Sequence, residues 1–147
     1  ELEAPFQVMI HGDFNSNNVI YNHEDQRIHY IDLHRSRMTD YVQDVSVFLV
    51  SNFRLPIMEA KLRSRPNSVI REFLLFARTF AAKQGDETFD ARLALALARS
   101  FVTSTRFEFN KKFARQMYMR GVYLMDKIVA YDGPWQDFKL PDDALYF

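Results

Sequence analysis

The sequence contains no cysteine among its 147 residues, which excludes disulfide bonds, thiolate zinc sites and cysteine nucleophiles. The absence of cysteine fits a cytoplasmic protein, and we expect a cytoplasmic location. Glycine is also scarce, at four residues, and no Gly-x-Gly-x-x-Gly phosphate-binding loop is present. No stretch reaches the roughly 18 apolar residues of a membrane-spanning helix, so no membrane span is expected.

Neither sign of charge is in excess, since 19 Lys and Arg residues balance 19 Asp and Glu residues. No net field therefore favours nucleic acid, and we do not expect it as a partner. Apolar residues make up 48% of the sequence, and the aromatic share is 15%, which argues against disorder. We expect a single domain that spans residues 1–147.

Short apolar segments open the chain and predict a small β region. Residues 6–10, 18–21 and 28–31 are expected to be strands, and the polar segment 22–27 predicts a β-hairpin between the last two. The pattern then changes to a helical period that begins near Tyr41 and stops before Pro56. Residues 1–55 would thus hold a hairpin and a first helix.

Residues 56–147 are expected to form a helical subdomain. The basic segment 57–67 is predicted to be a loop, with a breaker at Ser64-Arg-Pro-Asn. A helix capped by Asn67 or Ser68 would follow, and its predicted apolar face is Val69, Phe73, Phe76, Ala77 and Phe80. A buried helix from its cap at Asp90 to about Ser104 comes next. The fold class is therefore α+β, mainly α.

The last predicted helix runs from about Asn110 to Tyr131, and Gly133-Pro134 ends it. Its apolar residues recur every three or four positions, which predicts one buried stripe. The stripe consists of Phe113, Met117, Gly121, Leu124 and Ile128.

The segment His11-Gly-Asp-Phe-Asn-Ser-Asn-Asn18 carries the main chemical signal. Phosphoryl transfer needs a carboxylate that takes or orients the acceptor hydroxyl proton, and hard oxygen ligands that hold Mg²⁺. The spacing Asp13-x-x-x-x-Asn18, which protein kinases share, lets a tight loop point both side chains into one cleft. Asp32 ends the third strand, and the hairpin would return it to that cleft.

Together with Ile31-Asp32 and Asp40-x-x-Gln-Asp44, this segment resembles the aminoglycoside phosphotransferases, a kinase-like family related to choline kinase. The resemblance covers roughly residues 6–50 and implies the C-terminal lobe of a protein-kinase-like fold. It also implies Mg²⁺ and ATP or GTP as cofactors, and a small hydroxylated molecule, such as an aminoglycoside, another sugar or an amino alcohol, as the acceptor.

The resemblance implies a role for each matched residue. Asp13 would be the catalytic carboxylate, and Asn18 and Asp32 would bind Mg²⁺. His11 and Asp44 would support the catalytic loop structurally. Arg35, in the Ile-Asp-x-x-Arg string, is a candidate partner for a phosphate or a carboxylate.

Two departures from the family pattern leave alternatives open. His34 stands where a glycine is common, and Ile-Asp-Leu-His-Arg is also similar to the lipopolysaccharide-core sugar kinases. Only ten residues precede His11, without a glycine-rich loop or a strand lysine that could clamp ATP. We therefore expect the chain to need a missing N-terminal lobe of the same protein and to be inactive alone. A non-catalytic binding module that kept the kinase fold is the other alternative.

Overall fold

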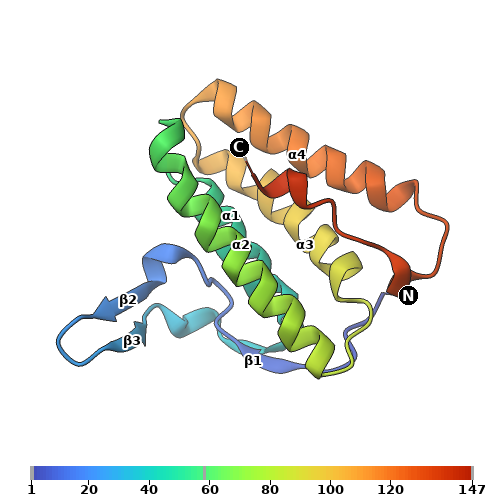
Figure 1. Cartoon of the computed structure of the whole chain (residues 1–147), viewed down its shortest axis with the longest axis horizontal. Helices are drawn as coiled ribbons and strands as arrows, with labels where there is room; N and C mark the ends of the chain where they lie inside the picture. Colours follow the sequence, from blue (N-terminus) through green and yellow to red (C-terminus); the bar gives the residue numbers. More distant parts are fainter. Residues whose placement is uncertain (1, 58, 147) are drawn as a thin grey trace.

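The computed structural model describes residues 2–57 and 59–146, and it confirms a mainly α architecture that begins with a small β region (Figure 1). The strands are β1 (Val8–Ile10), β2 (Val19–Asn22), β3 (Arg27–Tyr30) and β4 (Arg37–Thr39). The helices are α1 (Val42–Phe53), α2 (Ala60–Lys83), α3 (Phe89–Ser104) and α4 (Lys111–Val129). Within the described ranges, no helix has the length and apolar character needed to cross a membrane.

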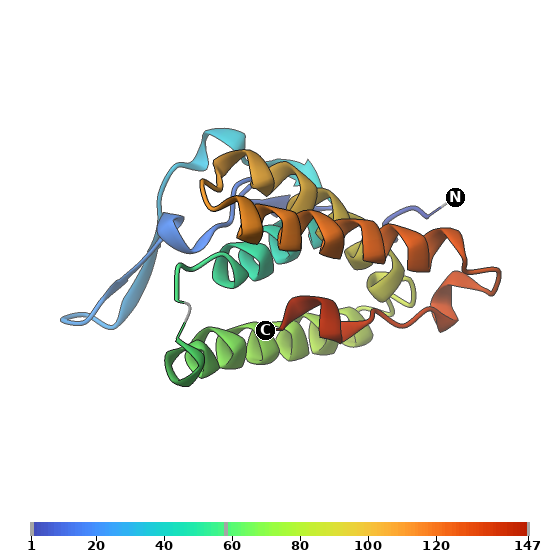
Figure 2. The same ribbon diagram turned by 90° about the horizontal axis from the view of Figure 1, so that it is seen from above.

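The four strands form two separate antiparallel pairs. The predicted hairpin is confirmed, because β2 pairs with β3 in a register that joins Val19 to Tyr30. The hairpin projects away from the helices in two perpendicular views (Figures 1 and 2). The second pair joins β1 to β4, a strand that the sequence did not predict, with Ile10 opposite Arg37.

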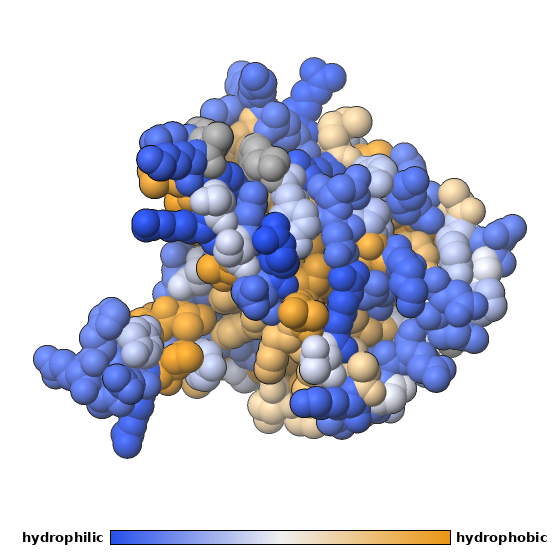
Figure 3. All heavy atoms as spheres, in the orientation of Figure 1, coloured by the Kyte–Doolittle hydropathy of each residue, from blue (hydrophilic) through white to orange (hydrophobic). Residues whose placement is uncertain are grey.

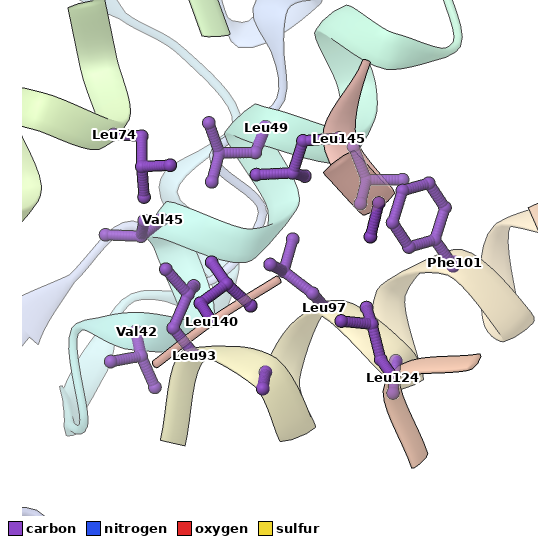
Figure 4. Close-up of a cluster of buried hydrophobic side chains, with 14 of the residues drawn as sticks. Val42, Val45, Leu49, Leu74, Leu93, Leu97, Phe101, Leu124, Leu140 and Leu145 are labelled. Atoms are coloured by element: carbon purple, nitrogen blue, oxygen red, sulfur yellow. The ribbon is translucent and has the colours of Figure 1, made fainter. Parts of the chain in front are cut away.

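α1 is the central helix of the core, since it packs against α2 and against α3, and α4 packs on α3. Its side chains Leu49 and Phe53 are fully buried, and Figure 4 shows Leu49 among leucines of the neighbouring elements. The predicted stripe of α4 is confirmed, because all five of its residues are buried. Asn110 caps α4 by accepting the backbone N–H of Phe113 at 3.1 Å.

The prediction of a loop over residues 57–67 is wrong, because α2 begins at Ala60 and contains Pro66. Neither Asn67 nor Ser68 is its N-cap. Proline removes only one backbone hydrogen bond from a helix, and packing can compensate for that loss. Here the buried Arg63 donates to the carbonyl of Leu55 at 3.0 Å and also to that of Phe53, which ties the start of α2 to the end of α1.

The predicted apolar face of α2 is only partly correct. Ala77 is buried, Phe73 and Phe80 are half-buried, but Val69 and Phe76 are 43% and 66% exposed. The helix is rotated from the predicted orientation, so that the fully packed stripe consists of Ile70, Leu74, Ala77 and Ala81.

Asp90 is not the N-cap of α3, a position that Thr88 occupies. Its carboxylate instead accepts two hydrogen bonds from Arg78, at 3.0 and 2.9 Å, and one from the backbone N–H of Leu140 at 3.0 Å. A guanidinium that bonds both carboxylate oxygens competes better for that carboxylate than the end of a helix does.

Candidate active site

The loop between β1 and β2 brings Asn18 within hydrogen-bond distance of Asp13. The side-chain amide of Asn18 donates to the backbone carbonyl of Asp13 at 2.9 Å. The amide of Asn15 donates to the Asp13 carboxylate at 3.2 Å. The Asp13 side chain remains 28% exposed, so a substrate hydroxyl can reach its carboxylate.

Asp44, in the first turn of α1, holds the start of this loop. Its two carboxylate oxygens accept the backbone N–H groups of His11 at 2.7 Å and of Gly12 at 3.0 Å. Burial raises the pKa of Asp44 above its usual value, although these two N–H groups act to lower it. Gly12 has a φ of +84°, and a Cβ there would lie 2.2 Å from the carbonyl oxygen of Arg35, so only glycine fits.

The imidazole of His11 connects the loop to the segment that carries Asp32. Nδ1 of His11 accepts the backbone N–H of Asp13 at 3.3 Å, while Nε2 lies 2.9 Å from the carbonyl oxygen of Ile31. A carbonyl can only accept, so the geometry assigns the proton of a neutral ring to Nε2. The backbone N–H of Ile31 also donates to the carbonyl of Asn18 at 3.1 Å. Asp32 therefore follows directly after the residue that pairs with Asn18.

Asp32 begins a tight turn that also brings Arg35 to the carboxylate of Asp13. Asp32 has a φ of +63° and the next three residues, Leu33–Arg35, form a 3-10 turn. His34 bonds to the Asp32 carboxylate at 2.7 Å, and Arg35 donates to the Asp13 carboxylate at 3.3 Å. The left-handed backbone conformation thus falls on Asp32, and His34 lies in the 3-10 turn with a negative φ.

Sequence reasoning missed two side chains of α1 that support the loop. Gln43 donates to the carbonyl of Gly12 at 3.3 Å, and the hydroxyl of Ser51 accepts the backbone N–H of Ser16 at 3.1 Å. The spacing of Ser51 from Asp44 is seven residues, which places both on one helical face. That period could have revealed Ser51, and Gln43 already stood in the Asp40-x-x-Gln-Asp44 motif.

The oxygen atoms of Asn18 and Asp32 suit Mg²⁺ better than a metal ion whose ligands all come from protein side chains. In residues 2–57 and 59–146, no group of three or more His, Asp or Glu side chains is placed to hold an ion. Mg²⁺ is usually held by one or two carboxylates together with water and substrate phosphates. Asn18 Oδ1 and Asp32 Oδ2 accept no hydrogen bond from any described residue, so these oxygens are available as ligands.

A buried ionic network fixes the chain between β4 and α1. Arg92 of α3 contacts the carboxylates of Asp40 and Asp86, and the Tyr41 hydroxyl donates to Asp86 at 2.5 Å. The side chains of Arg92 and Asp86 are 3% and 0% exposed. Burial lowers the pKa of Arg92, but the bonds to Asp40 and Asp86 outweigh it and raise the pKa above its usual value. In the structure, Asp40 of the motif is an ion-pair partner of Arg92.

Comparison with known proteins gave one match. Residues 1–65, which include all the site residues above apart from Asp86 and Arg92, match the model of the ecdysteroid kinase-like family. No curated protein and no solved structure matches the chain. The family match covers less than half of the chain, and the particular resemblance to aminoglycoside phosphotransferases stays a prediction. The match over residues 1–65 does place the chain in the kinase-like superfamily that is related to choline kinase.

Proposed function

We propose that this chain carries the catalytic centre of a phosphotransferase, which moves the γ-phosphoryl group of Mg²⁺-bound ATP or GTP to a hydroxyl of a small molecule. The observation that carries the proposal is a set of three hydrogen bonds. They link Asn18 to Asp13, Ile31 to Asn18, and His11 to Ile31. The set assembles the proposed base and both proposed metal ligands from two separate segments.

In the reaction, the acceptor oxygen forms a bond to the γ-phosphorus and the bond between that phosphorus and the bridging oxygen breaks. The nucleoside diphosphate leaves with the electron pair, and the hydroxyl proton goes to the Asp13 carboxylate. Arg35 and Asn15 each donate to this carboxylate and so orient it toward the cleft. Mg²⁺ held by Asn18 and Asp32 would supply positive charge at the phosphates.

A second, nucleotide-clamping lobe of the same protein is part of the proposal. Its support is an apolar surface on Met9, Phe14, Tyr30, Leu33 and Phe73, which line a cavity of about 560 Å³ beside the loop. Met9, Tyr30 and Leu33 are all more than half exposed. Figure 3 shows hydrophobic side chains gathered at the base of the hairpin and over the adjoining body. Exposed apolar surface of this kind is typical of a docking face.

The test is a transfer assay with the full-length protein and with the 147-residue chain, using Mg²⁺ and γ-labelled ATP. Amino sugars, neutral sugars, amino alcohols and hydroxy acids serve as acceptors. We expect labelled product from the full-length protein and little from the chain alone. Transfer only to a sugar of the lipopolysaccharide core would favour the alternative of a lipopolysaccharide-core sugar kinase. Magnesium-dependent nucleotide binding without transfer to any acceptor would point to a non-catalytic module and contradict the proposal.

A further inference from the structure

A second cavity, of about 460 Å³, opens beside the catalytic loop on polar residues. It is lined by Gly12, His34, Arg35, Ser36, Arg37 and Gln43. Gly12 immediately precedes Asp13, and Arg35 donates to the Asp13 carboxylate at 3.3 Å. The cavity therefore adjoins the proposed base, while the apolar cavity described above is lined by a largely different set of residues.

The lining of this cavity carries positive charge that the described residues do not neutralise. Two guanidinium groups line it and no carboxylate does. Arg35 forms one ion pair, with Asp13, through Nη1. Among residues 2–57 and 59–146, Arg37 has no carboxylate within ion-pair distance, and its one hydrogen-bond acceptor is the neutral amide of Gln43 at 3.1 Å.

The cavity wall is held in place by hydrogen bonds that do not depend on a ligand. Gln43 accepts from Arg37 and donates to the carbonyl of Gly12 at 3.3 Å, so it fixes the guanidinium relative to the loop. The hydroxyl of Ser36 donates to the carbonyl of His11 at 3.3 Å. A guanidinium that is already positioned loses little freedom on binding an oxyanion.

We infer that Arg37, together with Nη2 of Arg35, binds an oxyanion carried by the acceptor; Nε of Arg35 already donates to Nε2 of His34 at 3.3 Å. The acceptor would then be a hydroxylated carboxylate or phosphate whose hydroxyl reaches Asp13, and not a polycation, which both guanidinium groups would repel. This inference rests on the proposed function, since it assigns the acceptor of the same site. It would separate this chain from enzymes that act on cationic amino sugars.

The experiment is an NMR titration of the 147-residue chain without nucleotide, at constant ionic strength set by NaCl. The probes are glycerate, acetate and inorganic phosphate. We expect saturable shifts of the Gly12 amide and the Gln43 side-chain amide, with glycerate bound more tightly than acetate because its hydroxyls can also contact Asp13. Arg37→Gln should weaken glycerate binding about tenfold, the loss of one charge-assisted contact.

Arg99→Gln is the matched control, because Arg99 is an exposed arginine on α3. It should leave the shifts unchanged, and both variants should keep the parent melting temperature. The inference would be overturned if Arg37→Gln bound glycerate as tightly as the parent chain does. It would also be overturned if the parent bound phosphate but bound glycerate no more tightly than acetate. Arginine-dependent glycerate binding combined with no phosphoryl transfer in the full-length protein would support the oxyanion site and overturn the proposed function instead.

Discussion

The Nε2 atom of His11 lies 2.9 Å from the carbonyl oxygen of Ile31, twenty positions later in the sequence. This hydrogen bond joins the two halves of the site, because Asp13 lies two residues after His11 and Asp32 directly follows Ile31. Both ring nitrogens of His11 bond to backbone groups, so we expect His11 to position the loop.

Replacing His11 with alanine should loosen the link between the two segments. The Ile31 carbonyl and the Asp13 N–H would lose their partner, so we expect the free energy of unfolding to fall by about 1–2 kcal/mol. Urea denaturation of the 147-residue chain measures this. His29→Ala is the control, since His29 lies on the exposed strand β3. Equal effects of the two substitutions would contradict the positioning role.

Asp44→Ala should destabilise the chain more strongly. It removes one carboxylate and leaves the N–H groups of His11 and Gly12 without their acceptor, for which we expect a loss of about 3 kcal/mol. The same urea experiment applies, with Asp126→Ala on the exposed face of α4 as the control. A variant that unfolds like the parent but has lost activity in the full-length protein would instead make Asp44 a reactive group.

The raised pKa of Asp44 predicts a specific dependence of stability on pH. The folded chain binds the Asp44 proton at pH values where the unfolded chain has released it. The contribution of this group to the free energy of unfolding is therefore full below the ordinary carboxyl pKa and is lost as pH rises through the folded value.

The measurement compares the parent with Asp44→Asn, which cannot titrate, by urea denaturation at several pH values from the ordinary carboxyl range upward. The parent should lose stability relative to the variant as pH rises through this range. A parent that instead gains relative stability with rising pH would show that the two N–H groups outweigh burial and lower the pKa of Asp44.

Arg92→Met should be among the most destabilising substitutions in the chain. It leaves Asp86 as an unpaired carboxylate in the core, a defect that typically costs about 3–5 kcal/mol. Adding Asp86→Asn should recover part of that loss, because the buried charge is then removed as well. Denaturation of the single and double variants tests this, and Arg99→Met is the exposed control. Absence of any recovery in the double variant would mean that Asp86 is not the group left uncompensated.

Much of the site could be predicted from the sequence because its geometry is local. The spacing of Asp13 and Asn18 fixes a short loop, and the turn formers at residues 22–27 specify the hairpin that brings Asp32 back. Their catalytic and metal-binding roles remain predictions. Asp44 was found through its position in a motif, although its partners lie about thirty residues earlier in the chain.

The features that were missed depend on contacts between distant segments. β4 has only three residues and its pairing with β1 leaves no periodic signal. The start of α2 is fixed by Arg63 bonding to carbonyls at the end of α1, and this outweighs the local preference of Pro66 to break a helix. Asp90 has the local signature of a cap, but Arg78 from another helix takes its carboxylate.

Phosphoryl transfer by full-length protein that carries Asp13→Asn is the most direct test of the account. Asparagine keeps the shape of Asp13 but cannot take the hydroxyl proton, so we predict that turnover falls at least about a hundredfold. The melting temperature and the affinity for Mg²⁺-nucleotide should remain close to the parent values, and Asp126→Asn should change none of the three quantities. Turnover near the parent rate in a folded Asp13→Asn protein would contradict the central claim.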